Sequence, residues 1–274
     1  MTPPVRWRLG APGCDGLPGL AAAGSWLCAA ERARLGRLTV EKRRHDWLAG
    51  RLNAKALLAG LIEARVGRAS VPSALEIARH PSGAPFARVA AEAAPFSGFH
   101  AGEVLPVALS NSHSRGHALC AAVWIDEGWT PSPVPAGHDA RPVPTSLSLG
   151  ADLEWIEPRS DGFVRDFLTP EDQAFCLGAE GRERHLRASL AWSAKEAVLK
   201  VLRRGLTVDT WWLTCLPAGA CAPQEPALLP VEPDPERWEP LTIRLDPRMG
   251  HGRVQLAGVW REVEGFVATL ALGR

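Results

Sequence analysis

Apolar and polar residues alternate most strictly between Ser146 and Trp155. The apolar positions are Leu147, Leu149, Ala151, Leu153 and Trp155. Because successive side chains of a strand point to opposite faces, this period of two predicts a half-buried strand. The polar face of that strand carries two carboxylates side by side, Asp152 and Glu154.

A helical pattern follows about 40 residues later. A period of 3.6 predicts a helix from Ser189 to Arg203. Its predicted buried stripe consists of Ala194, Ala197, Val198 and Val201, and its opposite side of Trp192, Glu196, Leu199, Lys200 and Arg203. Glu196 and Lys200 are four residues apart, a spacing that is also typical of an ordinary helix ion pair.

The chain contains an approximate internal repeat. The segment from Arg44 to Lys55 recurs 140 positions later, from Arg184 to Lys195, and Glu31 and Glu171 have the same offset. Both copies continue into an apolar helical pattern. An internal duplication of an α+β unit explains this, and chance similarity between two Ala- and Leu-rich helices is the alternative.

Each half ends in a predicted strand rich in small and branched apolar residues, His117 to Trp124 and Phe266 to Leu272. A proline-rich stretch between the halves cannot sustain a helix. We therefore predict an α+β fold with an N-terminal half over residues 1–129, a connector over 130–144 and a C-terminal half over 145–274 that carries the acidic site.

The two copies of the repeated helix differ in charge. Ala56 and Gly60 occupy the positions of Glu196 and Lys200. One copy is therefore a plain helix while the other carries an acid and a base, which favours a functional role for the charged pair.

Asp152 and Glu154 indicate a cation site. Two like charges at this spacing repel unless a cation lies between them, and a hard divalent ion with oxygen ligands is suited to the position. Two solvated acids at the end of a strand are the plain alternative.

A polar segment from Ser110 to Ser114 precedes the first of the two terminal strands, and we expect it to be a loop. Its hydroxyl groups and the imidazole of His113 are suited to holding a phosphate, although an ordinary turn has the same composition. Arg44 and Arg51 upstream supply positive charge, or are simply solvated.

Composition narrows the functional classes. The 31 Lys and Arg nearly balance the 30 Asp and Glu, so no global field recruits nucleic acid. Six cysteines lack the spacing of zinc ligands or of a disulfide framework. No segment is typical of a membrane span or an export signal, and we expect a cytoplasmic protein.

Taken together, four stretches resemble the larger, pseudo-dimeric class of 4'-phosphopantetheinyl transferases, which activates nonribosomal peptide and polyketide synthases. They are Arg43 to Lys55, Asn111 to Ser114, Gly150 to Glu154 (GADLE) and Trp192 to Lys200 (WSAKEAVLK). The last two, in this order and about 40 residues apart, are the specific part of the resemblance.

The resemblance implies two similar α+β halves that form a pseudo-dimer with a cleft between them. It also implies transfer of 4'-phosphopantetheine from coenzyme A to a serine of an acyl or peptidyl carrier protein, with Mg2+ or, in its place, Mn2+. The implied metal ligands are Asp152, Glu154 and Glu196, and the implied catalytic residues are Glu196, Lys200 and Asp152. The implied coenzyme contacts are Arg44, Arg51, Ser112, His113, Lys195 and Lys200.

One position departs from this pattern. Ala84 stands where the family usually has Lys or Arg, and its side chain cannot contact a phosphate as the resemblance implies at this position. A catalytically silent binder of coenzyme A or a nucleotide is therefore the alternative function. Because two fused halves can build in one chain a cleft that smaller relatives build between subunits, we expect a monomer.

Overall fold

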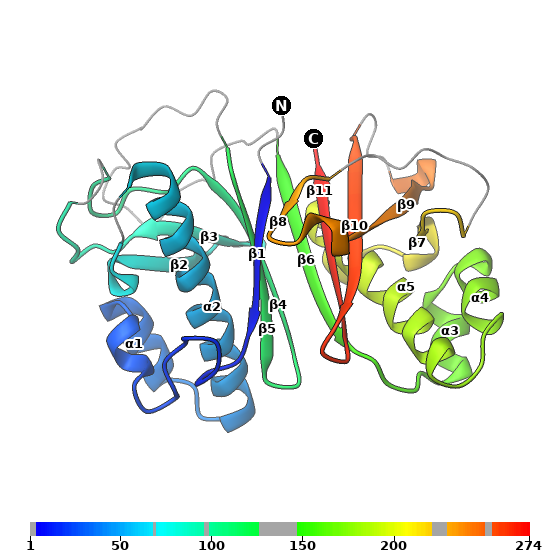
Figure 1. Ribbon diagram of the computed structural model, residues 1–274, viewed down its shortest axis with the longest axis horizontal. Coiled ribbons are helices and arrows are strands. Elements are labelled where there is room, and N and C mark those ends of the chain that lie inside the picture. Colours follow the sequence, from blue (N-terminus) through cyan, green and yellow to red (C-terminus); the bar gives the residue numbers. More distant parts are fainter. Residues whose placement is uncertain (1–3, 68–69, 96–98, 126–146, 221–228, 250–253) are drawn as a thin grey trace. The chain divides into compact units, whose positions relative to one another are not determined.

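Two long helices, each packed on antiparallel strands, organise the chain (Figure 1). The structure is a computed structural model that describes residues 4–67, 70–95, 99–125, 147–220, 229–249 and 254–274. The chain divides into an N-terminal unit, Arg6–Thr145, and a C-terminal unit, Met1–Val5 with Ser146–Arg274. The predicted α+β class is confirmed, whereas the connector predicted over 130–144 lies outside the described residues.

The N-terminal unit is built around helix α2. Its elements are β1 (Val5–Gly10), α1 (Ala29–Gly36), α2 (Glu41–Val66), β2 (Leu75–Arg79), β3 (Pro85–Val89), β4 (Val107–Ser114) and β5 (His117–Trp124). Strand β5 lies between β4 and β1, and β2 pairs with β3. Buried apolar residues of α2, among them Leu58 and Ile62, pack on the strands and form one core.

The C-terminal unit is built around helix α5. Its elements are β6 (Ser148–Trp155), α3 (Asp161–Phe167), α4 (Pro170–Leu177), α5 (Gly181–Val201), β7 (Leu213–Pro217), β8 (Val231–Glu232), β9 (Glu239–Leu245), β10 (Leu256–Val263) and β11 (Phe266–Gly273). Five strands form a sheet in the order β6-β11-β10-β9-β7. Helix α5 packs on β6 and β11 through Ala194, Ala197 and Val198.

Each unit contains one hairpin of the same kind. Arg115 and Gly116 connect β4 to β5, and Glu264 and Gly265 connect β10 to β11, all four with positive φ. Positive φ at both central residues is the conformation of the tight two-residue turn that matches strand twist. The two apolar runs predicted as strands are confirmed as β5 and β11.

Strand β6 is more deeply buried than its alternation predicts. Gly150 and Asp152, on the polar face, are as buried as Ala151 on the apolar face. Helix α5 covers the face that carries Gly150, where an added Cβ would lie 1.9 Å from the carbonyl oxygen of Ala197. The prediction of a half-buried strand was wrong because it could not include this helix.

Helix α5 is also longer and more buried than predicted, since it begins at Gly181 rather than at Ser189. Leu199 was predicted on the exposed side but is completely buried. Trp192 packs edge-on against Phe163 and Phe167 of α3. A helix with neighbours on several sides has no single apolar stripe, and this explains both errors.

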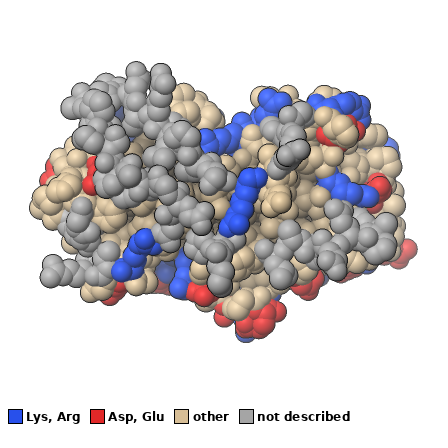
Figure 2. Space-filling view, turned by 90° about the horizontal axis from the view of Figure 1, so that it is seen from above, with Lys and Arg blue, Asp and Glu red and all other residues tan. Residues whose placement is uncertain are grey.

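Charged residues are dispersed over the face seen in Figure 2, where Lys and Arg form small separate groups among uncharged residues. Within the described ranges, no helix is long and apolar enough to cross a membrane.

We predict that Gly150→Ala destabilises the protein by about 3 kcal/mol, because its methyl group overlaps the backbone of α5 and forces it away from β6. Gly60→Ala is the matched control, since it lies on an exposed face of α2 with no atom within 4 Å of an added Cβ. It should stabilise α2 by about 0.5–1 kcal/mol. Urea unfolding measures both; equal stabilities of the two variants would contradict the close approach.

Candidate functional site

Strand β6 and helix α5 bring four of the predicted site residues together. The Lys200 ammonium group donates to Asp152 Oδ1 at 2.8 Å and to the carbonyl oxygen of Ala151 at 2.8 Å. Asp152 is almost completely buried, whereas Lys200 remains partly exposed. Lys200 is therefore tied to the strand, which the plain ion pair within the helix would not require.

The three acids share one electrostatic environment. Burial, with the charge of Asp152 as the next cause, raises the pKa of Glu154 to about 7. Burial and then Asp152 also raise the pKa of Glu196, and Glu196 in turn contributes to the raised pKa of Glu154. The charge of Asp152 therefore acts on both glutamates, and a cation among the three acids would lower this repulsion.

Arg159 is a member of the site that the sequence did not reveal. Its Nη2 donates to Glu154 Oε2 at 2.6 Å, and its guanidinium group lies over the ring of Phe163. The residue follows β6 in a non-repetitive segment where no periodicity places a side chain. No sequence signal could have identified it.

The chemistry of the three acids suits a hard divalent metal ion, but the structure does not gather them around a single point. Three carboxylates from two elements are the oxygen ligands that Mg2+ prefers. In the part of the chain that the structure describes, however, no group of three or more His, Cys, Asp and Glu side chains is gathered closely enough to hold a metal. Asp152 and Glu154 instead face the cationic groups of Lys200 and Arg159.

The predicted basic contacts of the N-terminal unit differ from each other in exposure. Arg44 is exposed on α2 and is free to meet an anion from solvent. Arg51 is buried, with its Nε 3.6 Å from Glu31 Oε1 and its guanidinium group over Trp47. The prediction that Arg51 contacts the coenzyme is therefore corrected, because its side chain is enclosed beside an acid.

Ser112 and His113 were predicted to lie in a loop. The structure places them at the end of strand β4. Adjacent side chains of a strand point to opposite faces, so these two side chains leave the backbone in different directions. His113 is half exposed, with Nδ1 3.9 Å from Asp46 Oδ2. The turn predicted by the polar composition is displaced to Arg115 and Gly116.

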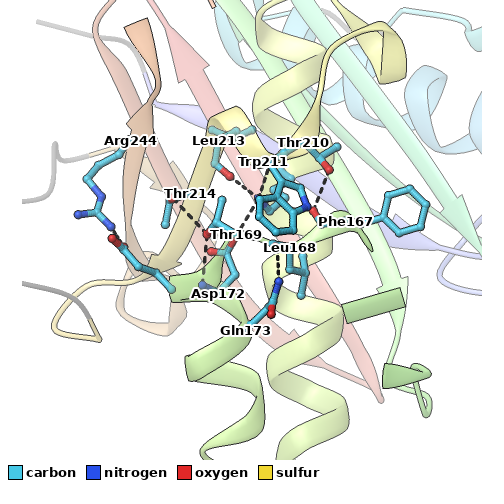
Figure 3. A network of polar contacts seen from close by, with 12 residues as sticks. Phe167, Leu168, Thr169, Asp172, Gln173, Thr210, Trp211, Leu213, Thr214 and Arg244 are labelled. Carbon is cyan, nitrogen blue, oxygen red and sulfur yellow. Dashed lines mark hydrogen bonds and ion pairs between the residues drawn. The ribbon is translucent and has the colours of Figure 1, made fainter. Parts of the chain in front are cut away.

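Lys195 was predicted to contact the coenzyme, but it lies in the interior of the fold. Its side chain is completely buried, and its ammonium group lies 2.8 Å from Asp172 Oδ2. It also donates to the carbonyl oxygens of Thr210 and Leu213, which lie around Asp172 in Figure 3. Since no part of this side chain reaches solvent, the prediction of a coenzyme contact is corrected to a structural ion pair.

The acidic cluster belongs to one unit only. Cys120 and Thr269 lie equally far from the hairpin turns that precede their strands. Cys120 pairs with Arg8, and Thr269 pairs with Asp152, so Arg8 is the counterpart of Asp152. By the same count, Gly10 of β1 occupies the position of Glu154. The N-terminal unit thus has neither the strand acids nor the charged helix positions of the C-terminal unit.

Fold and site together define an α+β protein in which a strand and a crossing helix hold three acids and a lysine. Residues 148–229 match the family model of the 4'-phosphopantetheinyl transferase superfamily. This segment contains β6, α5 and all four of these side chains. This match, over part of the chain, agrees with the superfamily that the sequence motifs predicted.

Two solved structures are similar to part of the chain. The ACPS-CoA complex of Chronobacterium ammoniagenes is 18% identical, with a TM-score of 0.34, and the match covers 47% of this chain and 96% of that chain. An apo-ACPS structure is 16% identical, also with a TM-score of 0.34, and the match covers 46% of this chain and 95% of that one. A search of curated proteins gives no match.

We predict a coupling energy of about 1–2 kcal/mol between Asp152→Asn and Lys200→Met in a double-mutant cycle without divalent metal, because removing either partner leaves the other charge poorly solvated. Urea unfolding of the four proteins measures it. The exposed pair Arg182 and Glu262 serves as the control and should give a much smaller coupling. Equal coupling in the two cycles would mean that Asp152 and Lys200 are merely a surface pair.

Proposed function

We propose that this protein transfers the 4'-phosphopantetheine group of coenzyme A to a serine of an acyl or peptidyl carrier protein and releases adenosine 3',5'-bisphosphate. The observation that carries the proposal is the superfamily match over residues 148–229, which includes Asp152, Glu154, Glu196 and Lys200. The raised pKa values of Glu154 and Glu196, to both of which the charge of Asp152 contributes, support it independently.

The reaction breaks a phosphoanhydride bond and forms a phosphate ester bond. The serine oxygen attacks the phosphorus that carries the pantetheine arm, the bond to the bridging pyrophosphate oxygen breaks, and the serine proton goes to a base. A serine hydroxyl is a weak nucleophile toward an anionic pyrophosphate, so the site must accept the proton and offset negative charge.

Each described side chain has a proposed part in this reaction. Glu196 accepts the serine proton, directly or through a water. Lys200, which is partly exposed and bonded to Asp152, stabilises the departing bisphosphate. Asp152, Glu154 and Glu196 would hold Mg2+, or Mn2+ in its place, and such an ion neutralises phosphate charge and aligns the reacting groups.

Several finer points belong to the same proposal. Arg44 offers an exposed positive charge for a coenzyme phosphate, and we propose that the protein acts as a cytoplasmic monomer. The alternative is a silent coenzyme A or nucleotide binder, which the absence of a basic side chain at Ala84 favours. The two proposals differ in whether a carrier protein gains mass.

We expect the protein, mixed with coenzyme A, Mg2+ and apo carrier protein, to increase the carrier mass by one phosphopantetheine group. Intact-mass spectrometry measures this gain. Removal of divalent metal by a chelator should abolish it, and added Mg2+ or Mn2+ should restore it. Coenzyme A binding without any gain of mass would favour the silent binder.

Glu196→Gln should lower kcat by at least about 100-fold, because an amide neither accepts the serine proton nor binds a metal ion as a carboxylate does. Asp152→Asn should have a similar effect. Glu183→Gln is the matched control on the same helix, where the acid pairs with Arg187 at the surface, and its kcat should stay near that of the native protein. Comparable activity of the Glu196 and Glu183 variants would refute the assignment.

A further inference from the structure

The surroundings of Lys195 are unusual for a lysine. This side chain is completely buried, and its ammonium group contacts three oxygen atoms on two other segments. Asp172 belongs to α4, whereas Thr210 and Leu213 mark the turn that leads into β7. A buried charge is tolerated only when paired and fully hydrogen-bonded, so this contact fixes α5 to both segments.

Asp172 is itself held in place. It is the third residue of α4, and its Oδ2 accepts hydrogen bonds from the backbone N–H and the hydroxyl of Thr169, which caps the helix (Figure 3). Side chains fixed by a cap have little rotational freedom. The acid that meets Lys195 is therefore rigid before the pair forms.

The same device occurs in the N-terminal unit. Lys55, 140 positions before Lys195, is also completely buried, and its ammonium group lies 2.6 Å from Glu31 Oε2. It donates to the carbonyl oxygens of Pro72 and Leu75, three residues apart as Thr210 and Leu213 are. Glu31 is the third residue of α1 and takes part in its capping box, as Asp172 does in α4. This repetition supports the duplication, with Asp172 rather than Glu171 as the counterpart of Glu31.

Glu196 lies between two immobilised residues of α5. Lys195 precedes it, held by the buried ion pair, and Ala197 follows it, with its carbonyl against Gly150 of β6. The first contact opposes rotation of α5 about its axis, and the second sets its distance from the strand. Both constraints act within one residue of Glu196.

We propose that the Lys195–Asp172 pair is a positioning device that orients Glu196 toward Asp152. The contacts of Lys195 and Asp172 do not depend on the proposed function. Only the reason given for orienting Glu196 rests on that function. Functional carboxylates need supporting contacts that hold their geometry, and loss of such contacts weakens metal binding. In the N-terminal unit the residue after Lys55 is Ala56, so the equivalent pair there has no acid to orient.

The N-terminal pair therefore provides a matched control. The double variant Lys195→Met with Asp172→Asn removes both charges, retains an acceptor for the Thr169 cap and leaves no unpaired ion. The double variant Lys55→Met with Glu31→Gln makes the corresponding change in the other unit and also removes the acid beside Arg51. Lys195→Gln, which retains a donor for the two carbonyl oxygens, is a milder second variant.

Two measurements test the device. Hydrogen exchange followed by mass spectrometry should show α5 exchanging at least about tenfold faster in the Lys195 double variant. In the Lys55 double variant, exchange should become faster in α2 and not in α5. Mn2+ titration followed by electron paramagnetic resonance should show affinity reduced by about tenfold or more in the Lys195 variant. Affinity in the Lys55 variant should stay within about twofold of the native value, and Lys195→Gln should be intermediate.

Native exchange of α5 in the Lys195 double variant would overturn the inference. So would an equal loss of Mn2+ affinity in both double variants, because a general loss of stability would then explain it. Native Mn2+ affinity in the Lys195 variant would also overturn it. Failure of the native protein to modify a carrier protein, with α5 responding as expected, would instead defeat the proposed function and leave the positioning device standing.

Discussion

The candidate site depends on the close approach of helix α5 to strand β6 at Gly150. Any side chain at this position would overlap the backbone of Ala197, so the absence of a Cβ decides how near the two elements lie. Two residues further along the strand is Asp152, and three residues further along the helix is Lys200, which donates to it. Gly150, which has no Cβ, thus determines where the charged groups meet.

The two units share several structural features but not the acidic site. Both units have the long helix with a buried lysine, the acid at the third position of a short helix and a two-residue hairpin turn. They differ at the positions that carry chemistry: Arg8 and Gly10 occupy the places of Asp152 and Glu154. The contacts that maintain the fold are repeated, and the acids occur in the C-terminal unit alone.

The sequence predicted what local periodicity determines and missed what distant neighbours determine. Alternation placed Asp152 and Glu154 on one face of a strand, and the repeat revealed the two similar helices. Periodicity could not show that α5 buries that face. Nor could it show that Lys195 meets Asp172, since the two are brought together by the packing of α4 on α5. Motif membership assigned Lys195 to the coenzyme, whereas burial assigns it to the fold.

The proposed function requires Asp152, Glu154 and Glu196 to bind one divalent ion together. Crystals of the native protein soaked in Mn2+ and measured at the manganese absorption edge test it most directly. We expect one anomalous peak per chain, within ligand distance of carboxylate oxygens of β6 and α5. We expect no peak at the equivalent place in the N-terminal unit. A peak elsewhere, or none near these three side chains, would contradict it.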